Sequence, residues 1–209
     1  MATPNTSKNK QTKEELRKAA LVCAAEQVFF AKGYAASSLD EIIAKSGGSK
    51  RNIYNYFGGK AGLLGAVIAK LSEELLLPPL NEKGVECPLQ ALSKLSQSFV
   101  SIIFSQKALS FWRMMIANAD QGPDAINQFM QNGPLRAQQA FAKELQRASE
   151  SGQLDIDDPT CTAAELLALL RGQQHVECLI GFSQLPTNSA LQQHAQSTLE
   201  RFIQNKRKN

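Results

Sequence analysis

The chain has 209 residues, of which 43% are hydrophobic and 20% are charged. This composition excludes an intrinsically disordered chain, and no run approaches the ~20 apolar residues of a membrane-spanning helix. The net charge of +4 is uneven, because residues 1–60 hold ten Lys or Arg against five Asp or Glu and residues 61–209 hold thirteen against fourteen. A basic N-terminal segment on a near-neutral body indicates that only this segment meets a polyanion.

Cysteine usage and the N-terminus bear on the compartment. Cys23, Cys87, Cys161 and Cys178 form no CxxC pair and lack the close spacing of a disulfide framework. Residues 1–11 are polar and contain no apolar core of a secretory signal. We therefore expect reduced thiols in a cytoplasmic protein without cofactor or metal. Redox or metal sensing is the alternative.

Apolar residues recur at helical spacing along almost the whole chain, which predicts an all-α fold of about nine helices. The first helix covers 13–32 and ends at Gly33. A capping box, Ser38 to Glu41, begins a short second helix that ends at Gly47-Gly48. Ser49 caps a short third helix, which places Ile53 and Phe57 inward and ends at Gly58-Gly59.

The remaining helices follow a proline boundary. A helix over 60–77 is expected to stop at Pro78-Pro79. Five more are predicted at 89–105, 108–119, 124–151 (broken at Gly133-Pro134), 159–185 (capped by Asp158 before Pro159) and 189–205. The predicted domains are a helix-turn-helix over 12–59, a connecting helix over 60–77, and a larger C-terminal domain over 78–209.

Two short helices joined by a glycine turn in a basic segment are typical of a DNA-reading helix-turn-helix. The outer face of the third helix is polar, and base readout is expected from Arg51, Asn52 and Asn55, because Arg pairs with guanine and Asn with adenine. The side chains expected to meet phosphates are Ser37, Ser38, Lys45, Lys50, Tyr56 and Lys60. The alternative is an ordinary solvated helix in a bundle.

Residues 25–64 resemble the DNA-binding domain of the TetR family of transcription regulators. The matching residues are Phe29, Gly33-Tyr34, Ser38, Ile43-Ala44, Gly47, Ser49-Lys50, Ile53-Tyr54, Phe57, Lys60 and Leu63-Leu64. The resemblance implies that Tyr54 and Lys60 meet phosphates, that Arg51, Asn52, Asn55 and Tyr56 face the major groove, and that Ser49 also lies at the DNA.

One residue of this segment departs from the family. Gly48 stands where the family usually has an aliphatic residue that packs the turn, so it is expected to loosen the third helix. Arg51 and Asn52 replace small residues, which suggests an individual operator sequence.

The C-terminal region resembles the AefR-like subgroup over 111–172, through Gly133-Pro134, Gly152-Gln153-Leu154 and Asp158-Pro159. The resemblance implies a homodimer on a palindromic double-stranded operator, acting as a repressor that a small-molecule effector releases by moving the connecting helix. It also implies a bacterial protein that is nucleoid-associated when it is bound to its operator. Activation in place of repression stays an alternative. The predicted dimerisation residues are Ala164, Leu167, Ala168, Leu179, Leu191, Ala195, Leu199 and Phe202, and packing inside one monomer is their alternative.

An effector site is expected where aromatic residues gather in the middle helices, which favours an apolar or aromatic compound. The candidate residues are Phe104, Phe111, Trp112, Arg113, Met115, Phe141, Arg171, His175 and Cys178, with Phe129 and Phe182 nearby in the same helices. The alternative for each of these residues, and the more common case, is ordinary core or a hydrogen-bonded structural residue.

Three other functions compete with a DNA-binding regulator. No GxxxxGK[ST], HExxH or GxSxG motif occurs and only two histidines are present, so we expect no enzyme and no catalytic residue. The second is a helical small-molecule-binding or adaptor protein without sequence-specific DNA binding, favoured by Gly48 alone. The third is a monomeric helix-turn-helix factor of another family, which sedimentation would detect.

Overall fold

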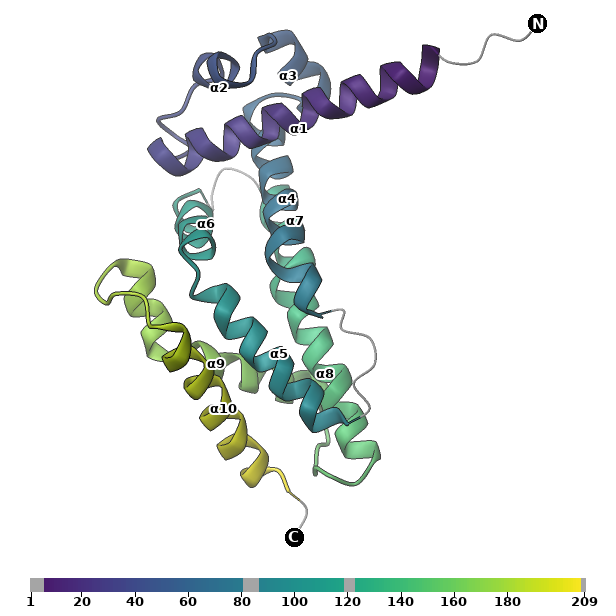
Figure 1. The fold of residues 1–209 in the computed structure, drawn as a ribbon, viewed down its shortest axis with the longest axis vertical. Coiled ribbons are helices and arrows are strands. Elements are labelled where there is room, and N and C mark those ends of the chain that lie inside the picture. Colours follow the sequence, from purple (N-terminus) through teal and green to yellow (C-terminus); the bar gives the residue numbers. More distant parts are fainter. Residues whose placement is uncertain (1–5, 81–86, 119–122, 208–209) are drawn as a thin grey trace, which may run out of the picture. The chain divides into compact units, whose positions relative to one another are not determined.

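The computed structural model describes residues 6–80, 87–118 and 123–207. Within these ranges the chain forms ten α-helices and no β-strand, which confirms the all-α fold (Figure 1). The helices are α1 (Thr6–Lys32), α2 (Leu39–Ser46), α3 (Lys50–Phe57), α4 (Lys60–Leu80), α5 (Pro88–Ile103), α6 (Gln106–Ala117), α7 (Pro123–Asn132), α8 (Pro134–Glu150), α9 (Pro159–Ile180) and α10 (Asn188–Asn205). None of these described helices combines the length and the apolar character needed to cross a membrane.

The helix starts and stops follow the capping signals of the sequence. The carboxylate of Asp158 accepts the amides of Thr160 and Cys161 at 2.9 and 3.0 Å, and Pro159 takes the first position of α9, where no N–H is needed. The break expected at Gly133-Pro134 separates α7 from α8. Pro134 has no N–H to donate, so a single long helix is interrupted there.

Three helix ends differ from the prediction by several residues. The α1 helix begins at Thr6 instead of Lys13. The α4 helix continues through Pro78-Pro79 to Leu80 instead of stopping at Leu77. Proline's fixed φ is itself helical, so the backbone can remain helical while it loses two donors. The α9 helix stops at Ile180 rather than 185, because Gly181 takes a left-handed conformation (φ 80°) whose amide bonds back to the carbonyls of α9.

The chain divides into two compact units. The first comprises residues 1–71 together with 114–128, and the second comprises 72–113 together with 129–209. In the first unit α1 packs on α2, and an ion pair of 2.6 Å joins Lys70 of α4 to Glu26 of α1. Apolar residues of α1, α2, α3 and α4 are fully buried there, including Ile42, Ile53 and Leu63.

The second unit is built around α5, α8, α9 and α10. The α5 helix packs against α8 and α10, and α8 packs against α9 (Figure 1). Their apolar stripes form one continuous core, in which Phe99 and Phe141 meet edge to face with ring centroids 6.0 Å apart. Edge-to-face packing is a preferred arrangement for aromatic pairs.

The α9 helix is kinked at Gly172, a feature that the sequence did not predict. Gly172 has φ 57° and ψ −177°, a combination that essentially only glycine adopts. The Leu170 carbonyl, which lies next to this kink, is bound by Nε2 of His194 from α10 at 2.9 Å. The kink is therefore held by a side chain that comes from another helix.

Candidate nucleic-acid interface and effector site

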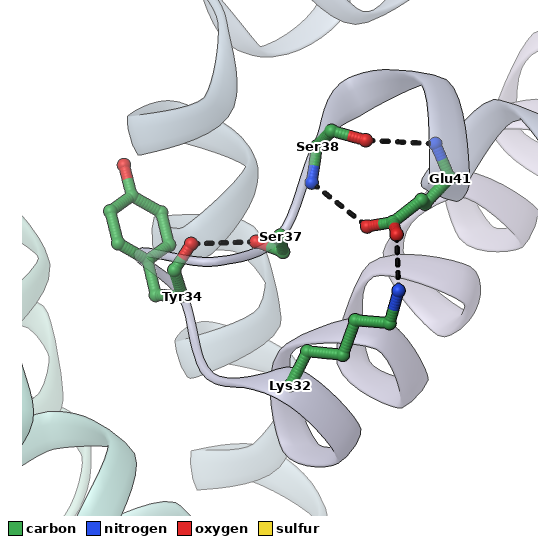
Figure 2. A network of polar contacts seen from close by, with 5 residues as sticks. All are labelled: Lys32, Tyr34, Ser37, Ser38 and Glu41. Atoms are coloured by element: carbon green, nitrogen blue, oxygen red, sulfur yellow. Dashed lines mark hydrogen bonds and ion pairs between the residues drawn. The ribbon is translucent and has the colours of Figure 1, made fainter.

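The start of α2 is fixed by a local network of polar contacts, shown in Figure 2. The Glu41 amide donates to Oγ of Ser38 at 3.3 Å, and the Ser38 amide donates to Oε2 of Glu41 at 3.1 Å, which confirms the capping box. The other oxygen of Glu41 pairs with the Lys32 ammonium at the end of α1. These contacts hold the pKa of the Glu41 carboxyl below its usual range, with the Lys32 contact as the main cause.

The turn between α2 and α3 explains why a glycine stands at position 48. Gly47 and Gly48 both have positive φ, 72° and 101°. A side chain at Gly48 would be strained by this backbone, and its Cβ would lie 3.4 Å from Nδ2 of Asn52. Gly48 thus serves the geometry of the turn, in addition to removing an aliphatic contact. Next along the chain, Oγ of Ser49 accepts the Asn52 amide at 3.3 Å and caps α3.

The α3 helix separates an inner from an outer face. Ile53 is fully buried, whereas Phe57, expected to lie inward with it, is only half-buried. Lys50, Arg51, Tyr54 and Asn55 are exposed, and Asn52 and Tyr56 are half-buried. Tyr54 is 59% exposed, so its side chain is accessible to a partner outside the domain.

The predicted phosphate-binding side chains differ in availability. Lys45 and Ser38 are exposed. Lys50 forms an exposed ion pair of 2.9 Å with Asp40, a type of pair worth about 0–1 kcal/mol and thus easily exchanged for a phosphate. Ser37 is buried and its hydroxyl donates to the Tyr34 carbonyl at 2.7 Å, so in this structure that hydroxyl has no hydrogen left for a phosphate oxygen (Figure 2).

Lys60, at the first position of α4, is held by its neighbours. Its ammonium lies 4.4 Å from the centroid of the Tyr34 ring and donates to the Ala35 carbonyl at 3.4 Å. Burial lowers the pKa of Lys60, and the charge of Glu41 opposes this effect. The ammonium is therefore positioned at the entry of α4, close to the α2 cap.

Gly62 is a positioning residue that the sequence analysis missed. A Cβ at Gly62 would overlap the carbonyl oxygen of Phe57, the last residue of α3. The close approach of α4 to the end of α3 therefore requires glycine. The only sequence signal was a glycine inside a helical pattern one turn after Gly58-Gly59.

In the second unit, several predicted effector-site residues form one aromatic cluster. Trp112 and Phe129 meet edge to face with centroids 5.0 Å apart, Phe111 and Phe129 at 5.2 Å, and His175 lies 5.4 Å from Phe104 and 6.5 Å from Trp112. We call Phe104, Phe111, Trp112, Phe129 and His175 the aromatic cluster.

Other predicted effector-site residues have different surroundings. The Arg113 guanidinium donates to the carbonyls of Cys178 and Leu179 at 2.8 and 2.7 Å, where it satisfies the C-terminal end of α9. Phe141 lies in the core against Phe99, and Met115 belongs to the first unit. Phe182 is 79% exposed, so the expectation that it lies in the aromatic core was wrong.

Arg171 and Cys178 contribute polar atoms near that core. The Arg171 guanidinium lies 5.9 Å from the centroid of the Phe99 ring, and burial lowers its pKa. Burial also raises the pKa of the Cys178 thiol, which donates to the Gln184 carbonyl at 3.5 Å. Cys178 is therefore a hydrogen-bonded neutral thiol.

A separate hollow of about 680 Å³ lies along α8 and the start of α9. Its walls include Gln138, Gln139, Lys143, Gln146 and Glu150, and none of the predicted effector-site residues lines it.

Most predicted dimerisation residues pack inside their own subunit. Five buried side chains, those of Leu167, Leu191, Ala195, Leu199 and Phe202, belong to the core of the second unit, and Leu179 packs against it. Their burial within one subunit agrees with the alternative of packing inside one monomer, because helical spacing marks a buried face without telling what covers it. Ala164 and Ala168 are exposed, as are the larger side chains of Leu169, Val176, Ile180 and Phe182.

Two protein-family models match this chain. Residues 21–67 match the model of bacterial regulatory proteins of the tetR family, and residues 90–205 match the C-terminal domain of AefR-like transcriptional repressors. The chain belongs to the TetR family. It is a DNA-binding transcriptional regulator, in a family whose regulators typically act as homodimers on operator DNA and are released by small-molecule effectors.

Individual TetR-family relatives agree with this assignment. The HTH-type transcriptional regulator SrpR of Pseudomonas putida is 26% identical over 157 residues, which cover 75% of this chain and 70% of SrpR. Among solved structures, a TetR-family regulator from Mesorhizobium loti MAFF303099 has a TM-score of 0.79 at 24% identity and covers 92% of this chain and 97% of its own. The flavonoid-responsive regulator FrrA has a TM-score of 0.74 at 26% identity, with coverage of 90% and 96%.

Proposed function

We propose that this TetR-family regulator reads its operator with the exposed face of α3 and represses transcription until an apolar or aromatic compound binds the second unit. The observation that carries the proposal is the two-sided character of α3, with Ile53 fully buried and Arg51, Tyr54 and Asn55 exposed. A recognition helix needs one face anchored in the domain and one face of hydrogen-bonding side chains for the groove.

The polar residues around α3 divide into two roles. Arg51, Asn52 and Asn55 have side chains that can pair bidentately with base edges, so they are assigned to sequence readout. Tyr54, Tyr56, Lys45, Lys50 and Lys60, with the capping residues Ser38 and Ser49, are assigned to phosphates, which fix register without specifying sequence. The backbone amides at the start of α2 and α3 add to phosphate binding through the helix dipole.

Dimerisation is assigned to the exposed apolar face of α9 and the turn after it. Leu169, Val176 and Ile180 lie on α9, and Phe182 follows it, all with large exposed fractions. Val176 and Ile180 are four residues apart on the part of α9 after the kink and therefore share a face, whereas Leu169 lies before the kink. Exposed apolar side chains that gather mark an interaction site, and a two-fold interface pairs the same patch with itself. A two-fold dimer presents its recognition helices about one helical turn of DNA apart, ~34 Å.

The aromatic cluster is assigned to the effector. Its rings are apolar and mutually edge-on, which suits a flat aromatic guest. The similarity to FrrA, a flavonoid-responsive regulator, supports an aromatic compound. Since α4 contributes residues to both units, a change in the packing of its second half can alter its first half and thereby the placement of α3.

The test is selection of bound sequences from a pool of random duplex DNA, combined with sedimentation of the free protein. The proposal predicts a palindromic motif and a dimer in solution. Ile180→Glu should give a monomer that no longer retains the palindrome, while Gln192→Glu, on an exposed position of α10, should behave like wild type. Retention that is uniform across sequences and abolished by modest salt would instead favour a small-molecule-binding or adaptor protein.

A further inference from the structure

His175 is a buried imidazole surrounded by aromatic rings. Its side chain is 6% exposed, and its ring stands edge-on to Phe104 and Trp112. The Nε2 atom is completely buried and has no hydrogen-bond partner among the described residues. Buried polar atoms in native proteins nearly always have a partner, so this orphaned nitrogen calls for a group that the chain does not supply.

The missing partner must be a hydrogen-bond donor. Burial and the nearby charge of Arg171 lower the pKa of His175, against the opposing effect of its hydrogen bond to the backbone of Ile103. The imidazole is therefore neutral near pH 7 and has one N–H. With this hydrogen placed on Nδ1, on the side of the Ile103 backbone, Nε2 has a lone pair and can only accept.

The surroundings narrow the kind of donor. An ammonium group is disfavoured because the Arg171 guanidinium is close enough to lower the pKa of His175. An aliphatic alcohol would not use the aromatic rings on either side of the imidazole. A phenol supplies both the hydrogen-bond donor and an aromatic ring. Its ring packs edge-to-face with aromatic neighbours. Its acidic hydroxyl becomes more negative when it donates, which a nearby cation favours.

We propose that the effector is a phenolic compound whose hydroxyl donates to Nε2 of His175 while its ring packs against Phe104 and Trp112. This inference rests on the proposed effector role of the aromatic cluster and adds the chemical class and the atom that recognises it. The hydrogen bond should make a phenol bind about tenfold more tightly than the same molecule without a donor, because the molecule without a donor leaves the buried acceptor unpaired.

The test is calorimetric titration of the whole chain of 209 residues with two matched probes, 4-hydroxybiphenyl and 4-methoxybiphenyl. Wild type should prefer the hydroxyl compound about tenfold, and quenching of Trp112, the only tryptophan in the chain, should report binding at the cluster. His175→Phe keeps an aromatic ring but removes the acceptor, so it should bind both probes equally. Gln174→Ala, at the exposed position next to His175 on α9, should retain the preference, and melting temperatures check that each variant folds.

The outcomes separate this inference from the proposed function. Equal binding of the two probes by wild type, binding of neither, or a preference that survives His175→Phe would overturn it. Operator binding by ligand-free wild type and His175→Phe is measured in parallel and does not depend on the hydroxyl. Loss of sequence-specific DNA binding in both proteins would contradict the proposed function and leave the calorimetric result standing for the site.

Discussion

The caps of α2 and α3 in the first unit and the polar contacts of α9 in the second unit span different distances along the sequence. In the first unit the caps of α2 and α3 join residues three positions apart, as Ser38 with Glu41 and Ser49 with Asn52. In the second unit Arg113 reaches the carbonyls of Cys178 and Leu179, and His194 reaches Leu170. Local capping can be read from sequence, whereas contacts between distant helices depend on the packing of the whole unit. The proposed recognition face of α3 therefore depends on local contacts, whereas the proposed effector site depends on how distant helices pack.

The largest expected effect is a loss of stability on substitution in the core of the second unit. Phe141→Ala removes a fully buried ring that packs on Phe99, and it should lower the free energy of unfolding by about 3–5 kcal/mol. Urea unfolding followed by far-UV circular dichroism measures this loss. Gln139→Ala, an exposed residue of the same helix, is the control and should change stability by less than ~0.5 kcal/mol. A similar small loss for Phe141→Ala would show that the second unit tolerates rearrangement.

The next effect concerns the contact between α3 and α4. Gly62→Ala places a methyl group where the Phe57 carbonyl oxygen lies, so α3 and α4 must separate at a cost of about 1–3 kcal/mol. Operator affinity should fall along with stability, because α3 is displaced. Ala61→Ser, exposed on the same turn, is the matched control. Unchanged operator binding by Gly62→Ala would mean that the close approach does not position the recognition helix.

The capping residues should have smaller and strictly local effects. Ser38→Ala removes the hydroxyl that accepts the Glu41 amide and should lower the free energy of unfolding by about 1 kcal/mol. Thermal unfolding of Ser38→Ala and of Ser37→Ala, whose hydroxyl also bonds locally, measures each contribution. Ser38→Asp should keep nearly the wild-type stability, since Asp is also a good cap, and this result would support the capping role of Ser38. A loss far above this range would show that the cap is coupled to the rest of the unit.

The smallest expected effect is the pH dependence due to His175. Burial, followed by the charge of Arg171, holds the folded-state pKa below the ordinary histidine value of about 6.5. As the pH falls through that value the unfolded chain takes up a proton that the folded chain does not, so stability present at higher pH is lost. Urea unfolding between about pH 8 and pH 5 should show this decline, and His175→Gln should reduce it. An unchanged decline in His175→Gln would assign it to other groups.

Prediction from sequence succeeded where the signal was local. The capping box at Ser38, the break at Pro134 and the cap at Asp158 each depend on residues within a few positions, and the structure has all three. The buried face of α10 was recognised as apolar, but helical spacing could not tell a partner subunit from the subunit's own core. The kink at Gly172 escaped prediction because its stabilising contact comes from His194.

The candidate sites divide in the same way. The exposed face of α3 followed from Ile53 on its inner face and from the resemblance of residues 25–64 to a known domain. The structural role of Arg113 could not be read from sequence, since its acceptors lie more than sixty positions away. The orphaned Nε2 of His175 is likewise visible only once the helices are packed.

The most direct test of the central claim compares base-reading with phosphate-binding residues on the selected operator. Asn55→Ala should relax the base preference at one symmetric pair of positions and weaken binding by about 1–3 kcal/mol per contacted base. Lys50→Ala should weaken all sequences alike and reduce the slope of log affinity against log salt by about 1. The account is contradicted if Asn55→Ala and Arg51→Ala leave the selected motif unchanged, because the exposed face of α3 would then not read the DNA sequence.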